Sequence, residues 1–203
     1  SMSGDNIDNL NQSVKTMIES FKKAETMETF IKLSIITFGS ENGVDLHTKL
    51  TEVSKVNFEP LFANGATPMG TAFKMAKAMI EDKTLFQGRD YRPTIILLSD
   101  GEPTDDWKNP LNDFISTGRS SKCDRMAVSI GGKGREPLDK FIEGCANPLF
   151  YAEDADKLIE QFKKITMSIT MRTKSVNKNQ IIDINNVLDG KDINDINFDD
   201  FKV

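Results

Sequence analysis

The stretch "PTIILLSDGEPTDDW", residues 93–107, decides the fold. Its first half is an unbroken apolar and β-branched run, which is typical of a strand buried on both faces of a parallel sheet. The run ends in an acidic, turn-forming cluster that begins at Asp100. In open parallel α/β sheets, ligands bind beyond the carboxyl ends of the strands. Asp100 is therefore a candidate binding residue, although an Asp that only fixes a turn is the simpler interpretation.

Helical and strand patterns alternate on both sides of this stretch. Apolar spacings predict helices over 6–24, 69–82, 109–117, 136–145 and 154–171, and strands over 29–38, 45–53, 94–100, 124–131 and 148–152. A short turn would set the second strand antiparallel to the first. The pattern predicts a three-layer α/β fold, with a doubly wound, mostly parallel sheet and helices on both faces. We expect one domain over residues 1–171.

Composition narrows the class of protein. The chain has 203 residues and a formal charge of -5, and its basic residues are scattered, so we expect no nucleic-acid partner. No apolar run reaches the roughly 18 residues of a membrane span, and the first residues do not resemble a secretory signal. We therefore expect a cytoplasmic protein without a membrane partner. Cys123 and Cys145 have no metal-ligand spacing and are expected to be free thiols.

Residues 172–203 form an Asn- and Asp-rich appendage. No register in it matches a calcium-binding EF-hand loop. It also has more apolar residues than a solvated tail needs, so part of it is expected to pack on the domain or on another molecule.

A second candidate element is "NGATPMGTAF", residues 64–73. A glycine turn, the Thr67 hydroxyl and a proline lead directly into a helix. Thr67 could cap that helix or bind a ligand. His47 is interpreted as a surface or edge residue and Trp107 as a packing residue. The acidic residues after Asp100 could bind a second ion, but the favoured interpretation is that they shape their loop and start the helix near Trp107; they are Glu102, Asp105 and Asp106.

These two stretches, in this order and in this α/β setting, resemble the von Willebrand factor A domain. The opening "SMSGDNIDNLNQSV" is similar to the segment after the first Asp of that family's metal motif. The resemblance covers roughly residues 1–170, and "SDGEPTDDW" is especially similar to the cytoplasmic bacterial branch associated with tellurium resistance and stress response. Ala66 stands where many relatives have Gly.

The resemblance implies a metal-ion-dependent adhesion site. It assigns Thr67 as the hydroxyl ligand of the second loop, Asp100 as the acidic ligand, and Ser1 as the last serine of the first loop. Hydroxyl and carboxylate oxygens suit Mg²⁺, or Mn²⁺ or Ca²⁺ in its place. With few carboxylates bound directly, such an ion accepts an acidic residue of a partner protein as its last ligand. The resemblance thus implies a protein-binding module and not an enzyme.

The sequence departs from the family pattern at its start. The pattern calls for an apolar first strand, an Asp four positions before Ser1 and a Ser two positions before it, and the sequence contains none of them. The expected fold then has its first central strand missing or replaced, and the metal can be absent. Either the two strands that would flank the missing strand pair directly, or another segment takes its place in the sheet. That segment would come from a second copy by strand exchange in a homodimer, or from the tail of the same chain. The tail offers one such segment, "NQIIDINN", in which Ile181 and Ile182 precede Asp183 much as an apolar strand precedes the missing Asp of the family. The alternative is that the tail packs as irregular structure on the outside of the domain.

The competing function is that of a Mg²⁺-dependent doubly wound enzyme which uses Asp100 on a phosphorylated substrate. The sequence shows no phosphate-binding loop, and it shows no second carboxylate at a spacing that would identify it as catalytic. We therefore favour the metal-dependent protein-binding module.

Overall fold

The structure, a computed structural model, describes residues 5–40, 43–63, 65–87 and 90–175. Its elements follow one another along the chain as α1 (Asp5–Ala24), β1 (Lys32–Ser40), β2 (Gly43–Glu52), α2 (Met69–Glu81), β3 (Thr94–Ser99), α3 (Lys108–Ser116), β4 (Asp124–Ile130), α4 (Arg135–Phe141), β5 (Phe150–Ala152) and α5 (Ala155–Lys174). Two short 3-10 helices, Val53–Lys55 and Ser120–Lys122, precede the α2 loop and β4.

The strands form two sheet pieces. Strands β3, β4 and β5 make a parallel sheet in that order, with Thr94 level with Asp124 and Ser99 level with Ser129. Strands β1 and β2 make an antiparallel pair with several register shifts. All seven residues of β4 are buried, as expected of a strand covered on both faces.

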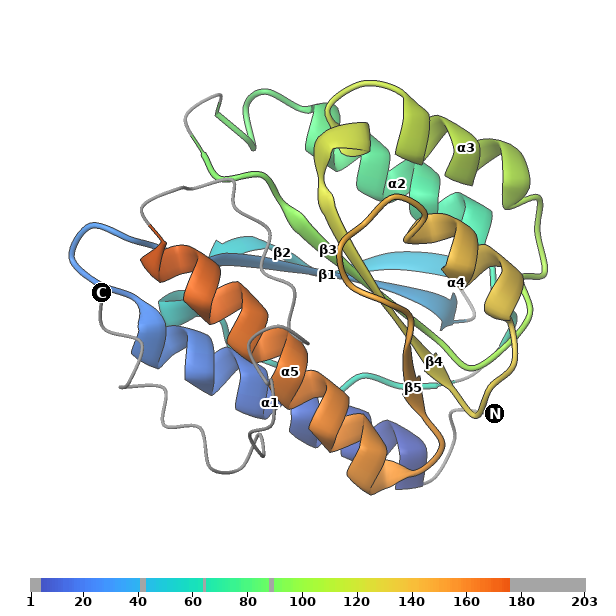
Figure 1. The fold of residues 1–203 in the computed structure, drawn as a ribbon, viewed down its shortest axis with the longest axis horizontal. Helices are drawn as coiled ribbons and strands as arrows, with labels where there is room; N and C mark the ends of the chain where they lie inside the picture. Colours follow the sequence, from blue (N-terminus) through green and yellow to red (C-terminus); the bar gives the residue numbers. More distant parts are fainter. Residues whose placement is uncertain (1–4, 41–42, 64, 88–89, 176–203) are drawn as a thin grey trace.

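Helices cover both faces of the strands (Figure 1). On one face α1 and α5 pack together and enclose a first core, which includes Ile18, Val128 and Ile165. On the other face α2, α3 and α4 enclose a second core. Its centre is three phenylalanine rings, one from each helix, whose centroids lie 5.7–5.9 Å apart: Phe73, Phe114 and Phe141. The three-layer α/β fold is therefore confirmed.

The two sheet pieces lie in the same layer but are not hydrogen-bonded to each other within the described residues. Side chains of β1 and β3 pack on both cores: Leu33 and Ile96 contact the first, while Phe38 and Ile95 contact the second. Among the residues that the structure describes, each of these two strands is paired on one side only. Four of the six residues of β3 are only half-buried, in contrast to β4.

The predicted elements are observed, with shifts of a few residues at their ends. The last helix extends to Lys174, past the expected domain boundary at residue 171, and residues 176–203 lie outside the described part of the chain. Cys123 and Cys145 are free thiols, as predicted. In the described ranges, no helix is long and apolar enough to cross a membrane.

Candidate functional site

Two loops meet beyond the carboxyl end of β3. The Thr67 loop precedes α2, and the Asp100 loop follows β3. The Thr67 N–H donates to Thr104 Oγ1 at 3.0 Å, and the Thr104 N–H donates to the Thr67 carbonyl oxygen at 2.9 Å. This reciprocal pair ties together two segments that are far apart in the sequence, at the edge of the sheet where ligands bind in this class of fold.

The cap of α2 is supplied by Asp105. Its Oδ1 accepts from the Gly70 N–H, and its Oδ2 accepts from the Thr71 N–H, each at 2.8 Å; Oδ2 also accepts from Thr71 Oγ1 at 2.9 Å. The N-cap residue is Pro68, which makes no side-chain cap bond. The interpretation of Thr67 as the helix cap is therefore wrong, because the negative charge that satisfies this helix end comes from the other loop.

Gly70 allows the two loops to approach. A Cβ at this position would lie 2.0 Å from the Asp106 carbonyl oxygen. Only glycine leaves room for the Asp106 backbone against the first turn of α2. The sequence signal "PMG" therefore marks a loop contact in addition to a helix start.

The turn at Asp100 is held by its neighbour Ser99. The Ser99 hydroxyl accepts from the Gly101 N–H at 3.3 Å and donates to the Gly101 carbonyl oxygen at 3.1 Å. Asp100 Oδ2 is a buried oxygen. Thr67 Oγ1 lies 3.5 Å from the place that a Cβ on Gly101 would take, so the Thr67 hydroxyl adjoins the residue after Asp100. The structure thus brings two of the three predicted ligands to one edge, while Ser1 lies outside the described residues.

The other acidic residues of this loop have structural partners. Besides Asp105, Glu102 accepts from the Gly134 N–H at 3.0 Å, and Asp106 accepts from Asn109 Nδ2 at 3.0 Å. The prediction that they shape the loop is confirmed. Asp105, however, caps α2 and not the helix near Trp107. Sequence reasoning missed this cap because its acceptor lies on the Asp100 loop and its donors lie in the first turn of α2, far away in the sequence. Among the described residues, no group of three His, Cys, Asp or Glu side chains could hold a metal.

The remaining candidate residues lie elsewhere. His47 is half-buried on β2, where its Nδ1 lies 3.0 Å from Thr48 Oγ1. Trp107 is half-buried and packs against the second core. It also borders a surface groove between α3 and α4, in which Glu136 lies 3.6 Å from the Lys108 ammonium.

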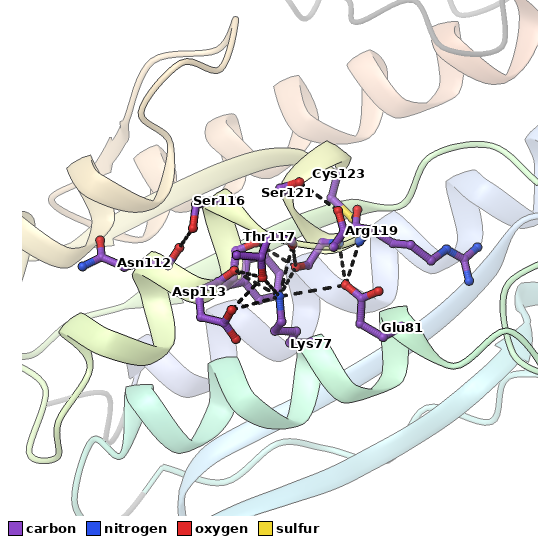
Figure 2. A network of polar contacts seen from close by, with 12 residues as sticks. Lys77, Glu81, Asn112, Asp113, Ser116, Thr117, Arg119, Ser121 and Cys123 are labelled. Carbon is purple, nitrogen blue, oxygen red and sulfur yellow. Dashed lines mark hydrogen bonds and ion pairs between the residues drawn. The ribbon is translucent and has the colours of Figure 1, made fainter.

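A polar network anchors the opposite end of α2 (Figure 2). Lys77 Nζ donates to Thr117 Oγ1 at 2.7 Å, to the Asp113 carbonyl oxygen at 3.0 Å and to Ser120 Oγ at 3.1 Å. One turn on, Glu81 accepts from the backbone N–H groups of Arg119 and Ser120. These bonds join α2 to the end of α3. Together with the Asp105 cap, they hold α2 at both ends. The Thr67 loop therefore leads into a helix that is fixed in place.

A family model for the von Willebrand factor type A domain matches residues 1–164. The chain therefore belongs to the von Willebrand factor type A domain family, a class composed in general of metal-dependent protein-interaction modules, typically without enzymatic activity.

A solved structure, von Willebrand factor type A from Catenulispora acidiphila, is similar to it with a TM-score of 0.57 and 17% sequence identity. The match covers 81% of this chain and 38% of that one, so it supports the fold alone. No match was found among curated proteins.

Proposed function

We propose that the chain is a metal-dependent protein-binding module whose ion is held by Thr67 and Asp100, with Ser1 as a third ligand. The observation that carries the proposal is the meeting of the Thr67 hydroxyl with the Asp100 loop at the carboxyl edge of β3, while Asp105 takes over the cap of α2. Gly101 has no side chain to fill the space beside the hydroxyl. A hydroxyl and a carboxylate are hard oxygen donors that suit Mg²⁺, Mn²⁺ or Ca²⁺.

The proposed ligand is an acidic residue on a partner protein. Hydroxyl ligands leave the charge of a divalent ion largely uncompensated, so the ion retains affinity for an incoming carboxylate. Thr67 and Asp100 hold and orient the ion, and the Ser99 and Thr104 bonds keep their loops in place. The likeness of "SDGEPTDDW" to the tellurium-resistance branch further suggests a role in a cytoplasmic stress-response assembly.

The test follows the water bound to Mn²⁺ in the loaded protein. We expect millimolar glutarate to lower the water-proton relaxivity, because its carboxylate displaces a metal-bound water. The uncharged isostere glutaramide should leave the relaxivity unchanged. The control variant Asp156→Asn, which removes an exposed carboxylate on α5, should behave as the wild type. Equal responses to both compounds, or a full glutarate response in Thr67→Ala, would refute the proposal.

The competing enzymatic function makes a separate prediction. A Mg²⁺-dependent hydrolase that uses Asp100 would turn over a generic phosphomonoester such as p-nitrophenyl phosphate, and Asp100→Asn would abolish the turnover. We expect no turnover that depends on Asp100, because the neighbouring carboxylates of Glu102, Asp105 and Asp106 are held by backbone or amide groups.

A further inference from the structure

The groove between α3 and α4 is a feature that the proposed metal site leaves unexplained. The two helices lie next to each other over the second core (Figure 1), and the groove between them has a volume of about 670 Å³ and is open to solvent. The Trp107 ring borders it at the start of α3. Three carboxylates also line it: Glu136, Asp139 and Glu143. An aromatic ring beside carboxylates attracts a cation on two counts, through the ring face and through charge.

The chain's own Lys108 already places a cation there. Its Nζ lies 5.5 Å from the centroid of the Trp107 ring and 3.6 Å from Glu136 Oε1. The second distance is longer than a hydrogen bond, and the Lys108 and Glu136 side chains are 65% and 72% exposed. Exposed ion pairs of this kind contribute little to stability. The ammonium is therefore held weakly, and another cation can take its place at small cost.

The negative charge of the groove is only partly compensated. Lys140 forms an ion pair with Glu143. Lys108 is the cation nearest Glu136. Within the described ranges, the Asp139 carboxylate makes no ion pair. Asp139 comes one helical turn after Glu136 on α4, and both line the groove. Once Lys108 turns away, these two neighbouring carboxylates are left without a paired cation.

We propose that the groove binds an arginine side chain of a partner protein, whose guanidinium displaces the Lys108 ammonium. A guanidinium stacks flat on an indole ring, and its planar fork of N–H donors suits neighbouring carboxylates. An ammonium is a compact, strongly hydrated charge that gains less from either contact.

The occupant belongs to a protein because of the shape of the groove. A small free cation would keep most of its surface in water in so open a groove, whereas ligand pockets enclose most of their ligand. A side chain carried by a protein brings further contacts with α3 and α4. Trp107 is half-buried and packs against the second core, so its ring is held in place before the partner arrives. This binding is independent of the metal site.

The only tryptophan of the chain reports on the groove directly. The test titrates the full chain with the peptide acetyl-Gly-Arg-Gly-amide and follows Trp107 fluorescence, at fixed ionic strength and with EDTA present to exclude any contribution from a metal. We expect a saturable change. The same peptide with citrulline, the uncharged isostere of arginine, should bind about threefold or more weakly, because it lacks the cation–π and charge terms. No saturable change, or equal affinity for both peptides, overturns the proposal.

The displacement step makes an unusual prediction. Lys108→Ala should bind the arginine peptide about two- to fivefold more tightly than the wild type, because the competing cation is gone. Lys74→Ala removes the same charge from the exposed face of α2 and should leave the affinity unchanged. Unchanged or weaker binding in Lys108→Ala, or equal tightening in both variants, would overturn the displacement of Lys108.

The two carboxylates are tested together. Glu136→Gln/Asp139→Asn should weaken binding of the arginine peptide about fivefold or more, since charged hydrogen bonds are lost. Asp156→Asn, which removes an exposed carboxylate on α5, is the control and should bind as the wild type does. All of these substitutions are at exposed positions, and circular dichroism verifies that each variant is folded. Full affinity in the double variant would contradict binding of the arginine in the groove. A failure to bind Mn²⁺ would refute the proposed function and leave this proposal standing.

Discussion

Asp105 joins two loops through a single side chain. Its two carboxylate oxygens accept three hydrogen bonds at the start of α2, and the helix therefore depends on a residue that comes after β3 in the sequence. The neighbouring Asp106 has one exposed partner, Asn109. Two adjacent acidic residues, indistinguishable by sequence pattern, thus differ in what they stabilise.

We predict that Asp105→Ala lowers the free energy of unfolding by about 1 to 2 kcal/mol, as expected for loss of a helix cap. Asp106→Ala should change it by less than about 0.5 kcal/mol, in the range of surface substitutions. Urea unfolding followed by circular dichroism measures both values. Equal losses in the two variants would contradict the assignment of the cap to Asp105.

The buried Cys123 thiol should make the free energy of unfolding depend on pH. Burial raises the pKa of its thiol from the ordinary value of 9.0 to about 11. The folded state holds the proton more tightly than the unfolded state, so this stabilising contribution is complete below pH 9 and is lost as the pH rises through 11. We expect the stability advantage of the wild type over Cys123→Ala to shrink between pH 8 and pH 11. A constant difference over that range in urea unfolding would be evidence against a buried neutral thiol.

At the level of elements, α2 is fixed at both ends, by Asp105 at its start and by the Lys77 and Glu81 contacts toward its end (Figure 2). The apolar side chains at its centre, Phe73 among them, fill the second core. The helix can thus hold the Thr67 loop in one position. A site built from hydroxyl groups requires such support, because its ligands must be placed before the ion binds.

We predict that Lys77→Met destabilises the protein by about 1 to 3 kcal/mol, since it leaves several acceptors at the end of α3 without their donor. Lys74→Met, on the exposed face of the same helix, serves as the control and should have little effect. Thermal unfolding of both variants, compared at equal concentration, measures the difference. A neutral Lys77→Met would mean that the ammonium contributes nothing net to the α2 and α3 contact.

The helices and strands were predictable from the sequence, but the contacts that join them to one another were not. Spacings such as Leu10, Val14 and Phe21 in α1 identify a helix because one face is buried, and that physical cause is local. The cap by Asp105, the Gly70 contact and the Lys77 network depend on which segments meet in space. Asp100 was identified as a candidate because it follows a buried strand, and Thr67 was identified as a ligand through the resemblance to the von Willebrand factor A domain. The tertiary bonds that hold these two residues carry no local pattern.

At the level of the whole molecule, the fold is two pieces of sheet between shared helix layers, with the candidate site at the carboxyl edge of β3 (Figure 1). The layers explain how the α/β architecture persists although β1 and β3 are not paired with each other in the described residues: both pieces are held by side chains on each face.

The most direct measurement of the central claim is the thermal midpoint of the full chain with and without millimolar Mg²⁺, beside the Thr67→Ala/Asp100→Ala double variant. Binding to the folded state alone must raise the midpoint by mass action, by an amount equivalent to about 2.7 kcal/mol when the ion is at 100 times its dissociation constant. We predict a rise for the wild type, for Mn²⁺ as well, and none for the double variant. No rise in the wild type, or the same rise in both proteins, would contradict the assignment of the metal site to Thr67 and Asp100.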